Sequence, residues 1–289
     1  MAKGISLHIG LNLVDPNHYS GWDGQLFGCE PDANAMDALA KNAGYDTRKL
    51  LTKQATRSAV KSALAGIAEE LSAGDIFFLT FSGHGGQVPD LQGEEADGMD
   101  ETWCLYDAQI VDDELSEYYA DFADGVRIVV LSDSCHSGSV TRAPMNRRLS
   151  ESGLRSAREP AAVDPTIRFR NMPIDVALRV FHDNPDTYIP IVEGLPAESE
   201  RRPVSASVRL ISACQDNQLA ADGAFNGLFT GTLLQVWRRG NFQGDYTKFH
   251  RAILDRLPST QSPNHIVVGK QDHEFDRQHP FSIAGASIS

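Results

Sequence analysis

The chain has 289 residues, 41% of them hydrophobic and 22% charged, and can therefore bury a sizeable core as a globular protein. No stretch approaches the ~18 consecutive apolar residues of a membrane span, so we expect no membrane insertion. The formal net charge is −13, and the four cysteines form no CxxC pair, which argues against a disulfide framework and a zinc ribbon. We therefore expect a protein of the reducing cytoplasm.

The excess negative charge comes from one window of the sequence. Residues 90–124 contain thirteen Asp or Glu and no Lys or Arg, while the remaining acidic and basic residues balance. Because no basic face is indicated, the composition argues against nucleic-acid binding. A local concentration of carboxylates suits a cation, either a metal ion or an Arg or Lys side chain.

Strands and helices are predicted to alternate along most of the chain. Apolar runs predict strands over residues 6–12, 45–51, 75–81, 126–131, 208–214 and 265–269. Helical spacing of apolar residues predicts helices from 33 to a C-cap at Gly44, and over 56–71, 227–239 and 246–257. This alternation is typical of an α/β fold with a mostly parallel central sheet and helices on both faces.

Residues 141–205 differ in composition from the rest. Five arginines fall within seventeen residues, against one acid, Glu151, and among Ser, Pro and Gly. We expect a long, exposed and irregular excursion. The expected organisation is one domain over 1–289, with a part over 1–140 that holds the catalytic residues, the excursion over 141–205, and a smaller part over 206–289.

Two strand ends carry residues suited to nucleophilic catalysis. The strand over 126–131 is followed by Ser132-Asp-Ser-Cys135, and the strand over 75–81 by Ser82-Gly-His84. Parallel strands present their carboxyl ends at one edge of a sheet, where ligands bind. A buried cysteine is usually inert, but Cys135 follows its strand among small polar residues, so we expect a thiol that His84 can activate.

The glycines around His84 leave its backbone accessible. Gly83, Gly85 and Gly86 carry no side chains that would keep a substrate away. The imidazole of His84 can take the thiol proton and later give it to the leaving amine. The backbone N–H groups of Gly85 and Cys135 are the expected donors to the developing oxyanion.

The two motifs resemble the catalytic signatures of metacaspases, which belong to the caspase-like cysteine peptidases. The matching segments are Phe81-Ser-Gly-His-Gly-Gly-Gln87 and Asp133-Ser-Cys-His-Ser-Gly-Ser139. The similarity extends over most of 5–140 and roughly 205–285, while the QACRG-type signature of true caspases is absent. The resemblance implies a caspase-haemoglobinase fold, a Cys/His dyad that needs no cofactor for its chemistry, cleavage after Arg or Lys, and a monomer.

By motif position, the resemblance also implies a substrate pocket for the basic side chain before the cleaved bond (P1). This S1 pocket falls on Cys29, Asp32, Ser82 and Asp133. A cationic side chain needs a buried anion, and a desolvated charged pair discriminates strongly against neutral side chains. Asp32 could instead cap the helix that follows it, and Asp133 could make a purely structural hydrogen bond.

The acidic window leaves two alternatives open. Many metacaspases require calcium, and the acidic ligands of the family match Asp100, Asp112 and Asp113, which suits the oxygen ligands that Ca²⁺ takes. However, Arg142 stands where a further acid is often found, and its charge would oppose calcium. The other interpretation is a solvated acidic loop.

The Arg-rich excursion also has two interpretations. It is either a flexible surface loop or a self-processing segment within 141–160, cut at Arg142 or at Arg147-Arg148. The sequence therefore predicts an endopeptidase that acts on proteins or peptides with Arg or Lys at P1 and binds neither nucleic acid nor membrane. The alternatives are a caspase-fold peptidase with another P1 preference and a catalytically silent interaction module.

Overall fold

The computed structural model describes residues 2–93, 95, 98–134, 168–214, 220–223 and 225–284. Within these ranges, six strands form a mixed sheet in the order β2-β1-β3-β7-β8-β9. Four neighbouring pairs are parallel, and the pair β8–β9 is antiparallel. The strands are β1 Gly4–Gly10, β2 Asp46–Leu51, β3 Ile76–Ser82, β7 Arg127–Asp133, β8 Ser207–Ser212 and β9 Asn264–Gly269.

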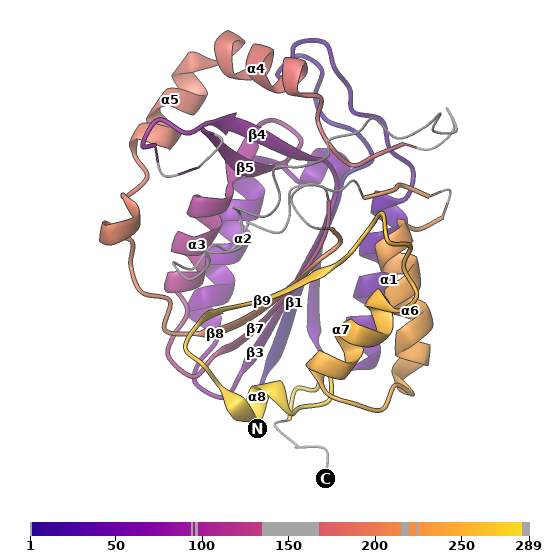
Figure 1. Ribbon diagram of the computed structural model, residues 1–289. Helices are drawn as coiled ribbons and strands as arrows, with labels where there is room; N and C mark the ends of the chain where they lie inside the picture. The colour runs from indigo at the N-terminus through magenta and orange to yellow at the C-terminus, as the bar shows by residue number, and fades with distance from the viewer. Residues whose placement is uncertain are drawn as a thin grey trace.

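Helices cover both faces of this sheet (Figure 1). One face packs against α1 Cys29–Asn42, α6 Leu228–Trp237 and α7 Tyr246–Leu254, and the other against α2 Arg57–Glu70 and α3 Asp112–Ala120. A short helix, α8 His273–Asp276, follows β9, and 3₁₀ turns lie at η1 Thr52–Gln54, η3 Glu198–Glu200 and η4 Arg238–Gly240. The predicted parallel sheet between two helical layers is confirmed.

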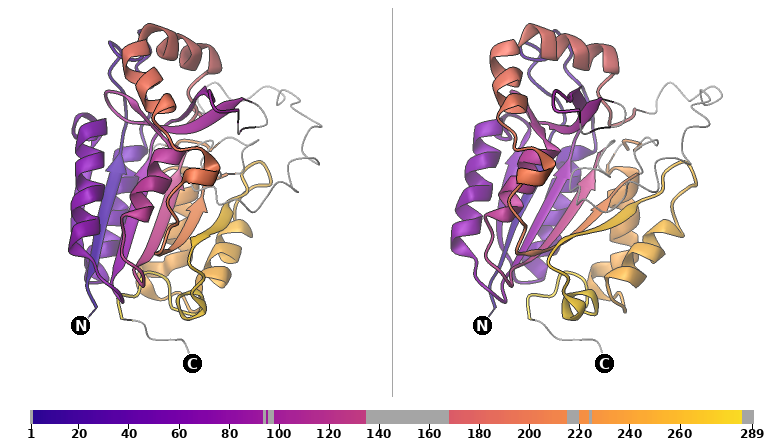
Figure 2. Two further views of the ribbon diagram at one scale, coloured as in Figure 1. Left: turned by 90° about the vertical axis from the view of Figure 1, so that its left-hand side faces the viewer. Right: turned by 60° about the vertical axis from the view of Figure 1, so that its left-hand side comes forward.

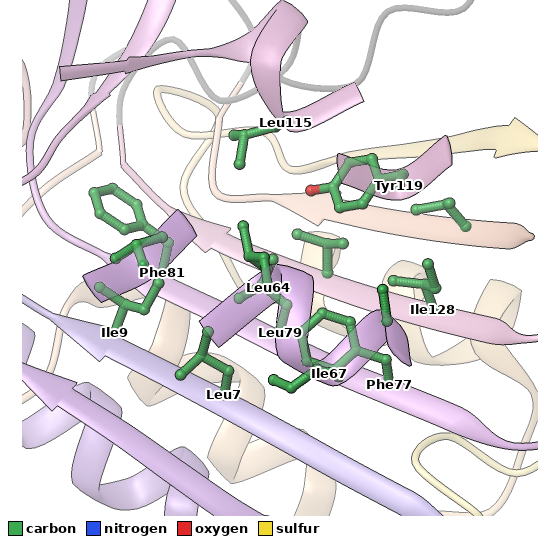
Figure 3. Packing of buried hydrophobic residues seen from close by; sticks show 14 of the residues in the cluster. Leu7, Ile9, Leu64, Ile67, Phe77, Leu79, Phe81, Leu115, Tyr119 and Ile128 are labelled. Carbon is green, nitrogen blue, oxygen red and sulfur yellow. The ribbon is translucent and has the colours of Figure 1, made fainter. Parts of the chain in front are cut away.

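The central strands are buried on both faces because their side chains alternate between two apolar layers. Phe77, Leu79 and Phe81 of β3 pack towards α2 and α3 (Figure 3), whereas Ile76 and Phe78 pack towards α1, α6 and α7. Strands of this kind are continuous apolar runs without polar alternation. This burial explains why the apolar pattern located these strands to within a few residues.

Helix α1 begins at Cys29, four residues before its predicted start. The side-chain oxygen of Asn12, two residues beyond β1, accepts hydrogen bonds from the backbone N–H groups of Cys29 and Glu30, each at 3.1 Å. These N–H groups have no partner within the helix itself. A cap supplied from another segment cannot be recognised from the local sequence pattern.

Most of the acidic window is folded, so its interpretation as a solvated loop is wrong for residues 99–120. Its described residues form β5 Met99–Cys104, β6 Gln109–Val111 and α3, and β4 Gly85–Pro89 completes a three-stranded antiparallel sheet with β5 and β6. Trp103, Ile110 and Leu115 from this region join the core of the molecule. Apolar residues interleaved with the acids provide the buried face.

The expectation of an irregular excursion over 141–205 is wrong for residues 174–193. These residues form α4 Ile174–Asp183 and α5 Pro185–Glu193, whose Val176, Val180 and Tyr188 belong to one buried apolar cluster with Val88 of β4. Figure 2 shows both helices beside β4, at the end of the molecule opposite the N-terminus. No helix in the described ranges is long and apolar enough to cross a membrane.

Candidate active site

The strand ends predicted to carry the chemistry meet at one edge of the main sheet. Ser82, the last residue of β3, pairs in register with Asp133, the last residue of β7. His84 follows β3 by two residues, in the connection to β4. Cys135, the predicted nucleophile, and Arg142, Arg147 and Arg148, the predicted self-processing arginines, lie outside the described residues.

His84 is oriented by a backbone carbonyl. Its Nε2 lies 2.9 Å from the carbonyl oxygen of Gly24, and its ring packs at a centroid distance of 4.7 Å against Trp22. Because a carbonyl only accepts, Nε2 carries the proton, and Nδ1 keeps its lone pair. Nδ1 is buried and has no hydrogen-bond partner among the residues that the structure describes. It is therefore the nitrogen available to take a thiol proton.

The environment of His84 keeps the imidazole neutral. Burial lowers the pKa of His84 to about 4, the bond to Gly24 opposes this shift, and the nearby Arg170 cation reinforces it. A neutral imidazole at neutral pH is a proton acceptor, which is the form that a general base requires.

The predicted S1 residues converge on a side chain of the chain itself, the guanidinium of Arg170. Arg170 Nη2 lies 2.9 Å from Asp32 Oδ2 and 2.8 Å from Asp222 Oδ1, and Arg170 Nη1 lies 3.0 Å from Asp133 Oδ1. Nη1 also donates to the Ser82 hydroxyl at 2.8 Å and to the carbonyl of Asp133 at 3.0 Å. Arg170 is completely buried.

Two of these carboxylates are held in place by the start of α6. Asp133 Oδ2 accepts from the backbone N–H and the hydroxyl of Thr230, at 3.0 and 2.7 Å. Asp32 Oδ1 accepts from Asn226 Nδ2 at 2.8 Å and from the Gly227 N–H at 3.0 Å. The positive end of a helix favours anions at such positions. Asp32 thus binds the residues that begin α6 and does not cap α1, in which it lies.

Two glycines leave room for the guanidinium. A Cβ atom at Gly28 would lie 2.9 Å from Arg170 Nη2, and one at Gly227 would lie 2.6 Å from the same nitrogen and 2.6 Å from Asp133 Oδ2. The third carboxylate, Asp222, is anchored beside Gly28, whose N–H it accepts at 3.1 Å. The pocket therefore fits a planar cation closely.

The carboxylates of this pocket keep the enclosed guanidinium charged. Burial raises the pKa of Asp32 to about 6, a shift that Arg170 opposes and Asp133 reinforces. Burial would by itself lower the pKa of Arg170, but the carboxylates around it, Asp133 first, raise it, so Arg170 stays charged. Cys29 is buried among these groups, and burial raises the pKa of its thiol, which makes it a poor nucleophile.

The sequence matches the caspase domain family (Peptidase_C14) over residues 12–281. The chain belongs to the caspase family. It is metacaspase-like: it is 30% identical over 293 residues to Metacaspase-1 of Schizosaccharomyces pombe, across 90% of this chain. That match spans 65% of the yeast relative, and matches to other fungal metacaspases span 35% to 56% of their lengths.

Solved structures support the caspase fold. The crystal structure of protein GSU0716 from Geobacter sulfurreducens is 46% identical with a TM-score of 0.83, and the match covers 97% of this chain and 99% of that one. Caspase-1 from Spodoptera frugiperda is 12% identical with a TM-score of 0.51, over 93% of this chain and 86% of that one, which is a likeness of fold. The predicted caspase-haemoglobinase-like fold is confirmed.

Peptidases of the caspase family need no cofactor for their chemistry, but the resemblance to metacaspases also implied a calcium site. Asp100, Asp112 and Asp113 are buried and lie near one another, and burial, with the charges of Glu101, Asp113 and Asp100, raises the pKa of Asp112. Within the described part of the chain, however, no group of three or more acidic, His or Cys side chains is arranged to hold a metal ion. Arg201 Nη2 lies 2.6 Å from Asp113 Oδ2. Calcium binding by Asp100, Asp112 and Asp113 therefore stays a prediction.

Three residues at this site were missed by sequence reasoning: Gly24, Arg170 and Asp222. Gly24 contributes only its carbonyl, and Asp222, next to Gly223, has the sequence of an ordinary turn. Arg170 could be sought only once the pocket was known to hold several carboxylates, because buried anions require a cation near them.

Proposed function

We propose that this chain is a cysteine endopeptidase that cleaves protein or peptide substrates after Arg or Lys, with Cys135 as the nucleophile and His84 as the general base. The observation that carries the proposal is the pocket of Asp32, Asp133 and Asp222, which encloses a guanidinium beside the strand end that leads to Cys135. Membership of a peptidase family supports it.

In the proposed reaction, His84 Nδ1 takes the thiol proton of Cys135, and the sulfur attacks the carbonyl carbon after the P1 residue. The backbone N–H of Gly85 stabilises the oxyanion that forms on the carbonyl oxygen. His84 then gives its proton to the leaving amine as the C–N bond breaks. Water hydrolyses the thioester, releases the P1 carboxylate and restores the thiol.

The pocket supports a basic P1 residue over the alternatives. An Asp at P1 would bring a fourth carboxylate among three, and like charges in a desolvated site repel strongly. A neutral Asn at P1 would leave the buried carboxylates without a cation. The desolvation of these charges would then not be offset by an ion pair, which would weaken binding. Arg and Lys are therefore the proposed P1 residues.

A panel of fluorogenic peptides with Arg, Lys, Asp or Asn at P1 tests the proposal, with the Cys135→Ala chain as control. The panel uses both the natural chain and Arg170→Gln, in which the pocket loses its own cation, each with calcium and with a chelator. Turnover of Arg and Lys peptides that depends on Cys135 is expected. Turnover of Asp or Asn peptides would indicate another specificity, and no turnover by either chain would favour a silent interaction module.

We extend the proposal to the setting of the enzyme, a monomer in the cytoplasm. The buried free thiols of Cys29 and Cys104 agree with a reducing compartment. Light scattering of the purified Cys135→Ala chain tests the oligomeric state. Self-processing within 141–160 is tested by mapping new N-termini in active and Cys135→Ala chains, and no activity-dependent cut there would exclude it.

A further inference from the structure

Residues 168–172 lie along the candidate active site, with a bend at Arg170 between the bridge residues Phe169 and Asn171. The N–H of Arg170 donates to the carbonyl of Ala220 at 3.0 Å, and the N–H of Asp222 donates to the carbonyl of Arg168 at 2.9 Å. Phe169 and Ala221 thereby form an antiparallel bridge. Addition of an extended strand to an exposed edge is a common way for a protein to bind a peptide.

The backbone is held on the other side of Arg170 as well. The N–H of Gly85, the expected oxyanion donor, lies 2.9 Å from the carbonyl oxygen of Arg170, and the N–H of Met172 donates to the carbonyl of Gly85 at 2.7 Å. Contacts therefore flank the peptide bond between Arg170 and Asn171 on both sides. The carbonyl of that bond lies where the carbonyl of a scissile bond is expected.

We propose that residues 168–172 bind as an internal substrate, with Arg170 at P1, and that the Arg170–Asn171 bond is a site of self-cleavage. This inference rests on the proposed function, in which Cys135 is the nucleophile and the pocket of Asp32, Asp133 and Asp222 selects P1. It adds the identity of one substrate, a segment of the same chain.

The cleavage step balances with water as the only co-reactant. The Cys135 sulfur bonds to the carbonyl carbon of Arg170, and its proton passes through His84 to the nitrogen of Asn171 as the C–N bond breaks. Water then hydrolyses the thioester to give a carboxylate at Arg170 and to restore the thiol. The products are a new C-terminus at Arg170 and a new N-terminus at Asn171.

A purely structural ion pair would not explain the whole arrangement. The pocket carboxylates have other donors that hold them without Arg170, among them Thr230 for Asp133 and the Phe27 N–H, at 2.8 Å, for Asp222. One carboxylate is enough to neutralise one guanidinium, whereas three carboxylates surround that of Arg170. The backbone hydrogen bonds on both sides of Arg170, including the one from Gly85, would not strengthen an ion pair. They would hold a scissile peptide bond in place.

Occupancy of the pocket by Arg170 keeps other substrates out until the bond is cut and the segment leaves. The space that remains beside the pocket carboxylates is a cavity of about 10 Å³, lined by residues such as Asp32, Asp133 and Thr80. This is about the volume needed for one water molecule. A second Arg side chain cannot enter beside the first.

The test compares the natural chain with four variants by intact mass and by N-terminal sequencing over time. We expect a new N-terminus at Asn171 in the natural chain and none in Cys135→Ala. Arg170→Lys should still be cut at this bond, and Arg170→Gln should not. Arg168→Gln is the matched control, because Arg168 lies over the ring of Phe27 and outside the pocket, and its chain should be cut after Arg170. An intramolecular cut proceeds at the same first-order rate at all protein concentrations.

Peptide hydrolysis separates this inference from the proposed function. Asn171→Pro keeps Arg170 in the pocket but resists cleavage, because the proline ring crowds the leaving nitrogen, so its initial rate on Arg peptides should lie well below that of Arg170→Gln. If Arg170→Gln hydrolyses Arg peptides while the natural chain stays intact at Arg170, the inference is overturned and the peptidase stands. If neither the natural chain nor Arg170→Gln hydrolyses any Arg or Lys peptide, and no chain is cut, both the inference and the proposed function fail. Circular dichroism confirms that each variant is folded.

Discussion

His84 donates its Nε2–H to the carbonyl oxygen of Gly24 at 2.9 Å, and this contact directs Nδ1 away from Gly24. Gly24 has φ +54°, and a Cβ atom there would lie 3.1 Å from His84 Cδ2 and 2.9 Å from Trp22 Cη2. In a catalytic triad the acid orients the histidine, and the carbonyl of Gly24 orients His84 in the same way.

Gly24→Ala should therefore slow the proposed reaction. The added methyl group displaces the imidazole, and small misplacements of a catalytic group cost roughly 100-fold in rate. We expect kcat to fall roughly 10- to 100-fold with little change in KM, because the pocket is untouched. Steady-state kinetics on an Arg peptide check this, and Gly21→Ala, also at positive φ but with no atom near its Cβ, is the control for backbone strain. Equal losses in both variants would contradict the role of Gly24.

Gly227→Ala should obstruct the S1 pocket without straining the backbone. Gly227 has φ −57° and ψ 153°, which alanine adopts freely, but its Cβ would lie 2.6 Å from the guanidinium nitrogen. We expect kcat/KM for Arg peptides to fall by roughly 100-fold or more, since a P1 cation can no longer reach its carboxylates. Kinetics in the Arg170→Gln background provide the measurement, and an unchanged kcat/KM would show that this pocket is not S1.

Asp222→Asn tests the residue that sequence reasoning missed. Asp222 and Asp32 both contact Nη2 of the buried guanidinium. Loss of one charge-assisted hydrogen bond costs about 1.5–3 kcal/mol, or roughly 10- to 150-fold in kcat/KM. Lys offers one nitrogen to these carboxylates where Arg offers two, so we expect a higher kcat/KM for Arg peptides than for Lys peptides. The ratio of these two kcat/KM values should be smaller in the variant. An equal ratio in both proteins would argue against a direct contact with P1.

Calcium should not stabilise this chain. Arg201 neutralises Asp113 in the acidic cluster, and the described residues hold no ready metal ligand set. Thermal unfolding of the Cys135→Ala chain with calcium and with a chelator is expected to give the same Tm. Arg201→Gln removes the competing cation, and calcium should then raise the Tm of that variant. A calcium-dependent rise in the parent chain would restore the metal site that the resemblance implied.

Stability should fall in acid partly because of His8. This buried histidine on β1 contacts Thr80 Oγ1 and Ser6 Oγ, each at 2.9 Å, and burial lowers its pKa to about 3. The unfolded chain, with a histidine pKa of about 6.5, therefore binds more protons between pH 6.5 and 3. Stability is lost as the pH falls through this window, by on the order of 4 kcal/mol for His8.

Urea unfolding as a function of pH, in the Cys135→Ala background, measures this contribution. His8→Asn should have a shallower dependence of unfolding free energy on pH between 6.5 and 4 than its parent. His182→Asn, at an exposed histidine of α4, is the matched control and should follow the parent. Parallel curves for His8→Asn and the parent would rule out a proton uptake at His8 on unfolding.

Much of the fold follows from local patterns. Strands β3 and β7 are unbroken apolar runs because both faces of the sheet are covered, and the polar residues after them mark the functional edge. The acidic window was harder to interpret, because thirteen acids concealed the apolar residues of β5, β6 and α3. The helices α4 and α5 were missed because an Arg-rich, Ser-rich stretch precedes them.

The sequence by itself determined the α/β sheet and the position of His84 just after a strand, because each of these depends on residues close together in the chain. Asp32 and Asp133 were expected in the pocket only from the resemblance to metacaspases. Only the tertiary structure decided that Arg170 fills the pocket, that Asp222 is its third anion and that Gly24 orients His84. Asp32 and Arg170 are 138 positions apart, and Asp32 and Gly227 are 195 positions apart. Contacts of that separation are selected by the packing of whole elements, and no spacing in the sequence encodes them.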